Sequence, residues 1–128
     1  MCLANNPYLS DILSQADALQ NALLRFDEAP LRSLARRLGA SHRSFGRVIL
    51  SGMGASFYAA YPVWLQLVRA GLPAFWVDSA ELLHYAFPLI RDDSLVWVFS
   101  QSGCSAEITA LLEQLKSSGA TVLATVND

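Results

Sequence analysis

Four short apolar runs that alternate with amphipathic stretches constrain the fold of this chain more than any other feature. The runs cover residues 48–50, 74–77, 94–99 and 121–126. A short continuous apolar run is typical of a strand that is buried on both faces. Strands that alternate with helices at this spacing predict right-handed crossovers and a parallel sheet. We therefore expect an α/β fold of three layers, of the flavodoxin-like or Rossmann-like type, with the sheet between helices.

The stretches between the runs have the three- and four-residue periodicity of helices. We expect a helix over residues 57–70 that ends at Gly71, and a second over residues 106–117 that ends near Gly119. A short helix capped by Asp78 is predicted to reach Tyr85. The chain stops directly after the fourth apolar run, where a parallel sheet normally needs a further covering helix. We therefore expect an incomplete domain.

Two further helices are predicted before the first strand. Residues 7–26 have an apolar stripe, with Asn6 as the cap and Pro7 in the first turn. A second helix is predicted from Pro30 to Gly39. These elements define an expected N-terminal helical arm of residues 1–46, followed by the sheet domain of residues 47–128.

Composition excludes several classes of protein. The chain has 128 residues, a formal net charge of −2 and only 16% charged residues, which argues against general nucleic-acid binding. Its two cysteines, Cys2 and Cys104, match neither a disulfide framework nor a zinc-binding pattern. The N-terminus lacks the features of a secretory signal, and no apolar run approaches the ~18 residues of a membrane helix. We expect a cytoplasmic protein that binds no metal, cofactor, nucleic acid or membrane.

Two turns rich in glycine and serine follow the first and third apolar runs, at residues 52–56 and 100–105. The carboxyl ends of parallel strands meet at one edge of the sheet, where ligands bind in such folds. The candidate donors to a ligand are Ser56, Ser100, Gln101, Ser102 and Ser105. The supporting backbone positions are Gly52, Gly54, Ala55 and Gly103. Hydroxyl groups at the start of a helix suit an anion with many oxygens, such as a phosphate.

Two alternatives to a phosphate site stay open at this point. Serine is a common helix cap and glycine is common in turns, so both segments could be ordinary connections. Gly52 and Gly54 also suggest a dinucleotide-binding turn, with Asp78 as the ribose partner. However, Phe57 stands where the third glycine of that fingerprint belongs, and Asp78 has a simpler role as a helix cap.

Taken together, the two turns carry a family resemblance. The relevant motifs are Gly54-Ala55-Ser56, Ser100-Gln101-Ser102-Gly103-Cys104-Ser105, Ala70-Gly71-Leu72-Pro73, Ala80-Glu81-Leu82 and the leading helix from Pro7 to Gln15. Residues 48–127 resemble the sugar isomerase (SIS) domain family. The likeness is greatest to the isomerase half of glucosamine-6-phosphate synthase (glutamine–fructose-6-phosphate aminotransferase) and to stand-alone sugar-phosphate isomerases and deglycases. The match corresponds to the first four strands of such a domain.

The resemblance implies binding of a phosphorylated sugar or amino sugar. It assigns Ser100, Gln101, Ser102 and Ser105 to the phosphate, with Ser56 contacting it from the first turn. The implied parent activity is ketose–aldose isomerisation, with or without transfer or removal of an amine. Ala55 and Cys104 replace a threonine and a glutamate of the family pattern, so contacts to the sugar itself are less well supported than the phosphate site.

The sequence leaves open whether the chain is an enzyme. Isomerisation needs a base that moves a proton between adjacent carbons, and the family's catalytic residues lie further downstream than this chain extends. Glu81 and Glu107 lie near the two turns, but each has a simpler structural use at a helix start. A non-catalytic module that senses a sugar phosphate is therefore the main alternative. We also expect a homo-oligomer, a dimer in the simplest case, because the leading helix and the edge of the sheet need cover.

Overall fold

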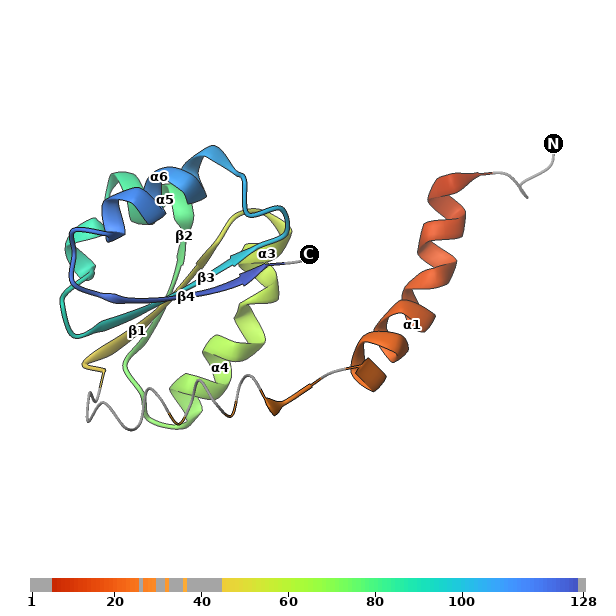
Figure 1. Cartoon of the computed structure of the whole chain (residues 1–128), viewed down its shortest axis with the longest axis horizontal. Helices are drawn as coiled ribbons and strands as arrows, with labels where there is room; N and C mark the ends of the chain where they lie inside the picture. The colour runs from red at the N-terminus through yellow and green to blue at the C-terminus, as the bar shows by residue number, and fades with distance from the viewer. Residues whose placement is uncertain (1–5, 26, 30–31, 33–35, 37–44, 127–128) are drawn as a thin grey trace. The chain divides into compact units, whose positions relative to one another are not determined.

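The computed structural model describes residues 6–25, 27–29, 32, 36 and 45–126. It divides the chain into two compact units, residues 1–42 and 43–128. The second unit contains one parallel sheet, in which the strands have the order β2-β1-β3-β4 (Figure 1). The strands are β1 (Arg47–Gly52), β2 (Ala74–Asp78), β3 (Ser94–Ser100) and β4 (Thr121–Val126). The predicted parallel sheet is confirmed.

Helices cover both faces of this sheet, as Figure 1 shows. One face carries α3 (Ala55–Ala59) and α4 (Tyr61–Arg69), which connect β1 to β2. The other carries α5 (Ser79–His84), the 3₁₀ turn η2 (Phe87–Leu89) and α6 (Ala106–Leu115), which lead to β3 and β4. The connection from β1 to β2 runs toward one edge of the sheet, whereas those from β2 to β3 and from β3 to β4 run toward the other edge. Because each crossover is right-handed, the helices of the first connection lie on one face and those of the other two lie on the opposite face. The predicted three-layer α/β fold is confirmed.

The core lies on both faces of the two central strands. Ile49 and Leu50 are neighbours in β1, and both are fully buried, each against a different layer of helices. Val96 and Val98 of β3 pack with Ile49 on the face covered by α5 and α6. A continuous apolar run in β1 is therefore needed because neither face of the strand meets water.

The single helix predicted over residues 57–70 is two helices in the structure. The first begins earlier than predicted, at Ala55, the second ends at Arg69, and the two are separated at Ala60. Pro62 has no backbone N–H, so the hydrogen bond that a continuous helix would make from this position to Tyr58 cannot form. Helical hydrogen bonding resumes when the Trp64 N–H donates to the Ala60 carbonyl at 3.0 Å.

Two predicted helix ends were also wrong by one or two residues. Helix α5 ends at His84 rather than Tyr85, and α6 ends at Leu115 rather than Ser117. Beyond α6, the hydroxyls of Ser117 and Ser118 donate to the carbonyls of Gln114 and Leu115, at 2.9 and 2.7 Å. Local side-chain bonds of this kind compete with the helical pattern and end the helix early.

The first unit contains α1 (Pro7–Arg25), which confirms the predicted leading helix. The Asn6 side-chain oxygen accepts a hydrogen bond from the Tyr8 N–H at 3.1 Å, as expected of an N-cap. The second predicted helix, from Pro30 to Gly39, lies largely outside the described residues. Within the part of the chain that the structure describes, no helix has the length and apolar character needed to cross a bilayer.

A close backbone approach joins β1, β3 and α3 at Gly52. A Cβ atom at this position would lie 2.9 Å from both the Phe57 nitrogen and the Phe99 carbonyl oxygen. Both are backbone atoms, so neither can move aside without shifting its element. Glycine is therefore required here by packing, because the first turn of α3 lies directly on the ends of the two central strands.

Replacing Gly52 with alanine should destabilise the protein by about 3 kcal/mol, the upper end of the usual range for an overpacked core site, because both contacts are with backbone atoms. Gly71→Ala is the matched control, because Gly71 has a positive φ of 78° but nothing within 4 Å of the added Cβ. That control should lose only about 1–2 kcal/mol, from backbone strain. Urea unfolding measures both, and an equal loss in the two variants would contradict the packing argument.

A buried pair of hydroxyls ties β1 to α5. Ser51 and Ser79 are fully buried, and their Oγ atoms lie 2.8 Å apart. Ser51→Ala or Ser79→Ala alone should cost about 1–3 kcal/mol, because the remaining hydroxyl would be buried without its partner. The double variant should cost clearly less than the sum of the two single losses. Chemical denaturation of the wild type, the two single variants and the double variant gives the interaction free energy of the two hydroxyls. If the two single losses simply add, the hydroxyls act independently.

Candidate functional site

A cleft lies at the carboxyl ends of β1 and β3, where the direction of strand order reverses. It consists of two adjoining cavities of about 360 Å³ and about 180 Å³. The wall residues that the two cavities share are Ala55, Ser56, Phe99, Ser100 and Gln101. The structure thus brings the two predicted turns together in one place, which is where ligands bind in open α/β sheets.

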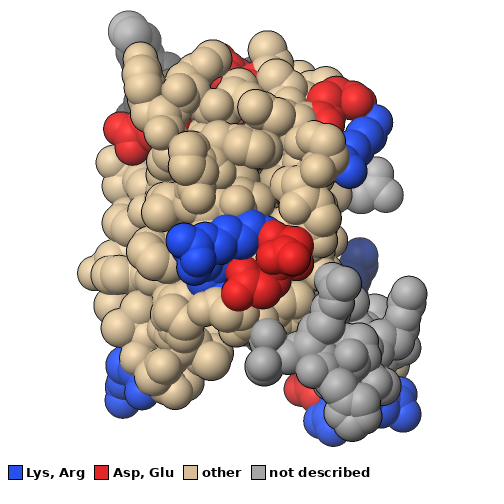
Figure 2. All heavy atoms as spheres, turned by 90° about the vertical axis from the view of Figure 1, so that its left-hand side faces the viewer, with Lys and Arg blue, Asp and Glu red and all other residues tan. Residues whose placement is uncertain are grey.

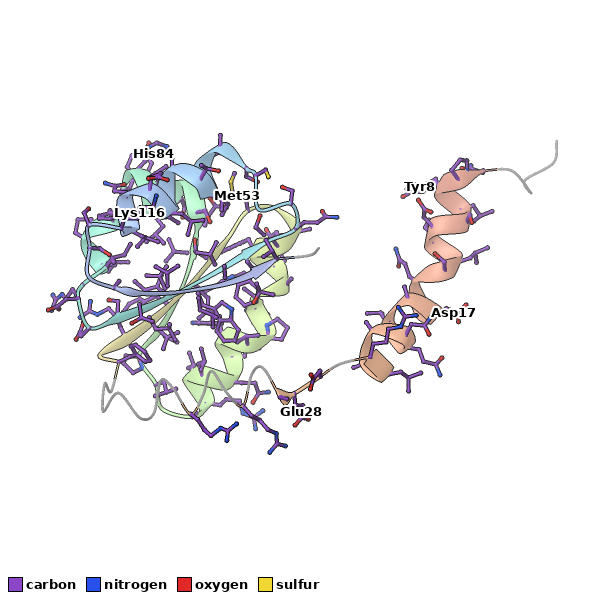
Figure 3. The ribbon with its side chains drawn as sticks, viewed as in Figure 1. Tyr8, Asp17, Glu28, Met53, His84 and Lys116 are labelled. Atoms are coloured by element: carbon purple, nitrogen blue, oxygen red, sulfur yellow. The ribbon has the colours of Figure 1, made fainter. Side chains whose placement is uncertain are left out.

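The smaller cavity is lined by all five polar residues that the sequence predicts as donors. Ser102 and Ser105 line it, together with Met53 from the turn after β1, which is labelled in Figure 3. The larger cavity extends over the end of β4 instead, where Thr125 and Val126 form part of its wall. A ligand with a polar head and a longer body could therefore occupy both cavities.

The first turn is shaped by its two glycines. Gly52 allows α3 to approach the ends of the strands, and Gly54, at a φ of 53°, precedes the first residue of α3. Neither glycine is among the residues that line the cavities; they position Ala55 and Ser56, which do line them. The Ser56 N–H is bonded to the Met53 carbonyl at 3.1 Å, while its half-buried side chain lies at both cavities.

Two serines of the second turn hold the turn itself. The Ser100 hydroxyl accepts a hydrogen bond from the Gly103 N–H at 3.0 Å, and the Ser102 hydroxyl accepts one from the Cys104 N–H at 3.2 Å. The interpretation of these residues as ordinary turn serines is therefore partly right. However, each hydroxyl uses only a lone pair in this bond and keeps its own hydrogen for donation. Both can stabilise the turn and still donate to a ligand.

Ser105 is different, because the structure gives it no capping bond. It stands at the N-cap position of α6, yet its side chain makes no hydrogen bond to the helix backbone. The side chain is half-buried and lines the smaller cavity. The first N–H groups of a helix also lack intrahelical partners and carry a partial positive charge. The Ser105 hydroxyl and the start of α6 are therefore placed to bind the same anion.

The cleft has no formal charge among the described residues that line it. Figure 2, by contrast, looks onto the side from which the strands begin and shows basic and acidic side chains gathered there. Any anion in the cleft would therefore be held by neutral donors and by the helix dipole. Within residues 6–25 and 45–126, no grouping of His, Cys, Asp and Glu could hold a metal ion.

Several residues considered from the sequence lie outside the cleft walls. Asp78 caps α5, accepting a hydrogen bond from the Ala80 N–H at 2.9 Å, which removes the support for its role as a ribose partner. Glu81 and Glu107 lie in the first turns of α5 and α6 and do not line either cavity. Cys104 is exposed and is likewise not a wall residue. The described cleft residues thus include no candidate base.

Sequence analysis missed the part of the cleft wall that is apolar except for Thr125. The residues concerned are Met53, Ala59, Phe99, Ile108, Thr125 and Val126. Thr125 and Val126 could have been found, because they end the fourth strand and the carboxyl ends of all parallel strands share one edge. Met53 lies within the predicted first turn but has an apolar side chain. Ala59, Phe99 and Ile108 fall inside predicted helices or strands, and only the packing shows that they border a cavity.

Residues 43–127 match the family model of the SIS domain. Arabinose 5-phosphate isomerase KdsD from Pseudomonas aeruginosa is 31% identical over 109 residues, which cover 85% of this chain and 32% of that protein. Arabinose 5-phosphate isomerase KpsF from Escherichia coli is 31% identical over 128 residues, covering 96% of this chain and 38% of that protein. The chain thus matches only about a third of the length of these relatives.

Solved structures show the same fold. An Escherichia coli protein in complex with a sugar phosphate matches with a TM-score of 0.73 and 24% identity, over 100% of this chain and 67% of that one. Tagatose-6-phosphate ketose/aldose isomerase from Escherichia coli matches with a TM-score of 0.63 and 21% identity, over 77% of this chain and 29% of that one.

The resemblance predicted from the two turns is therefore confirmed. The family match spans all four strands, the two turns that form the cleft and the helices between them. On this evidence the chain belongs to the SIS domain family, and phosphosugar isomerases are among its relatives.

Proposed function

We propose that the chain binds a phosphorylated sugar in the cleft, with the phosphate in the smaller cavity and the sugar in the larger one. The observation that carries this proposal is the Ser105 hydroxyl, which lines the smaller cavity at the start of α6 and makes no bond to the helix it precedes. A serine at this position would normally cap the helix. Its free hydroxyl is available to a ligand instead.

The donors around the smaller cavity match the chemistry of a phosphate. Phosphate oxygens accept several hydrogen bonds at once, and the cavity offers the hydroxyls of Ser56, Ser100, Ser102 and Ser105 together with the Gln101 amide. The partial positive charge at the start of α6 adds to them. Neutral donors and a helix end can hold a phosphate without lysine or arginine.

The larger cavity and the relatives indicate the kind of sugar. Its wall combines Ser56 and Gln101 with Ala59, Phe99 and Thr125, so it has room and polar groups for a short polyol chain. Two relatives that are 31% identical act on arabinose 5-phosphate by name. We therefore take arabinose 5-phosphate as the first ligand to test, and a hexose 6-phosphate or amino-sugar 6-phosphate as the next.

In an isomerase, the phosphate serves as a handle away from the reacting carbons. Its binding energy fixes the position of the C1 and C2 atoms, between which a proton moves. That transfer needs a carboxylate, imidazole or amine, and none belongs to the described residues of the cleft wall. We therefore propose that the residues of the cleft wall bind and position the ligand. Whether the chain also converts the ligand is tested separately, with the same sugar phosphate.

Calorimetric titration with arabinose 5-phosphate should show binding to the wild-type chain. Ser105→Ala should weaken it by about 1–3 kcal/mol, or roughly 5- to 150-fold, because one donor to a charged group is lost. The fold should be unaffected, since this side chain makes no hydrogen bond to α6. Ser117→Ala, beyond the other end of α6, is the matched control and should bind like the wild type. Unchanged affinity in Ser105→Ala would remove this residue from the site.

Two further titrations define the ligand class. Arabinose without its phosphate should not bind, and nicotinamide dinucleotide should not bind either; tight dinucleotide binding would favour the nucleotide-binding alternative.

A turnover assay separates an enzyme from a module that only senses the sugar phosphate. In this assay, NMR follows the conversion of arabinose 5-phosphate to its ketose.

A further inference from the structure

The larger cavity has one polar side chain that lies apart from the donors of the smaller cavity. Among the described residues, those that line the larger cavity but not the smaller one are Ala59, Thr125 and Val126. Of these three, Thr125 alone has a polar side chain. It therefore marks the one polar point of the cleft wall that is specific to the larger cavity.

Thr125 lies near the end of the edge strand β4, on the side of the sheet that α3 and α4 cover. It pairs in register with Phe99 of β3 and alternates along β4 with Leu123, which packs in the core cluster on that face. Side chains two residues apart in a strand lie on the same face of the sheet. The Thr125 side chain therefore lies beside Phe99, in the wall of the larger cavity.

The Thr125 hydroxyl is oriented by an indole group. The Nε1 atom of Trp97 donates a hydrogen bond to the Thr125 Oγ1 atom at 2.9 Å. An indole N–H can only donate, so the threonine oxygen must be the acceptor, and its hydroxyl hydrogen points to another partner. The branched side chain of threonine also has few χ1 rotamers. The hydrogen bond thus selects one orientation of the hydroxyl group.

Trp97 is itself held by packing against the cleft wall. Its ring stacks on that of Phe99, with the ring centroids 5.2 Å apart and an angle of 24° between the ring planes. Phe99 lines both cavities, whereas Trp97 lines neither. Trp97 therefore acts on the larger cavity through Thr125 and Phe99, which makes it a positioning residue.

We propose that the Thr125 hydroxyl, oriented by Trp97, binds an oxygen of the ligand at the end remote from the phosphate. The inference rests on the function proposed above, in which the phosphate lies beside Ser105 in the smaller cavity and the sugar extends into the larger one. A hydroxyl with a hydrogen and a second lone pair can bind either a sugar hydroxyl or a carbonyl oxygen. The cleft would thereby select phosphorylated sugars over phosphate esters too short to reach Thr125.

Titration of the whole chain with two phosphate esters, followed by ¹H–¹⁵N NMR, tests the role of Thr125. Arabinose 5-phosphate carries the distal oxygens, and glycerol 3-phosphate lacks them. Thr125→Val keeps the branched shape and should weaken binding of arabinose 5-phosphate by roughly 3- to 10-fold, because one hydrogen bond between neutral groups is lost. Its affinity for glycerol 3-phosphate should not change. The fold should persist, since Thr125 is exposed.

Two further variants at threonines of β4 serve as controls. Thr125→Ser keeps the hydroxyl and should bind arabinose 5-phosphate like the wild type. Thr121→Val makes the same exchange at the start of β4, where the residue lines neither cavity, and should also bind like the wild type.

The positioning role of Trp97 is tested with Trp97→Phe, which removes the indole N–H but keeps an aromatic ring beside Phe99. This variant should also bind arabinose 5-phosphate more weakly and glycerol 3-phosphate unchanged. Combined with Thr125→Val, it should cause no further loss, because Trp97 acts through the threonine hydroxyl. Its missing NMR signal identifies the Trp97 indole, which should shift in the wild type when arabinose 5-phosphate binds. Additive losses, or an indole signal that does not respond, would contradict this role.

The outcomes separate this inference from the function on which it rests. If Ser105→Ala weakens binding of arabinose 5-phosphate but Thr125→Val does not, the inference is overturned and the proposed function stands. If Thr125→Val weakens binding of both esters equally, the residue supports the cleft as a whole, and the inference is again overturned. If the wild type binds neither ester, the proposed function and the inference both fail.

Discussion

The contact at Gly52 is the constraint on which the rest of the site depends. It sets the start of α3 against the ends of β1 and β3, with backbone atoms of Phe57 and Phe99 only 2.9 Å from the position that a Cβ atom at residue 52 would occupy. This approach fixes where Ala55 and Ser56 lie relative to the second turn. Without it, the two turns would still follow neighbouring strands, but they would not border a common cleft.

The turn at residues 100–105 keeps its shape through hydrogen bonds within the turn itself. A loop that must bind an anion has to keep its shape when the ligand is absent, or binding would have to order it at a cost in free energy. Here Ser100 and Ser102 accept hydrogen bonds from backbone N–H groups within the turn, and Gly103 adopts a φ of 66° that suits glycine. The same side chains that shape the loop retain hydrogens for a ligand, so structural and binding roles are compatible in one residue.

The two units of the chain differ in how far they bury their apolar residues. The sheet unit buries its central strands on both faces, and its cleft presents neutral donors at the start of α6. The leading helix buries nothing within its own unit, although its apolar residues are regularly spaced. Membership of the SIS domain family concerns the sheet unit.

The order of strands and helices could be predicted from the sequence because the apolar runs are short and continuous and the intervening stretches are periodic. The polar residues of the cleft wall could also be predicted, since Ser56 and the serines from Ser100 to Ser105 follow strands whose ends share one edge. Local rules failed at Ala60 and at the end of α6, where Pro62 and the hydroxyls of Ser117 and Ser118 alter the backbone hydrogen bonding. Only the tertiary structure showed that Ser105 does not cap its helix and that Phe99, Thr125 and Val126 border the cleft. The physical reason is that strand and helix preferences depend on near neighbours along the chain, whereas the walls of a cavity and the partner of a hydroxyl depend on distances between segments that only packing brings together.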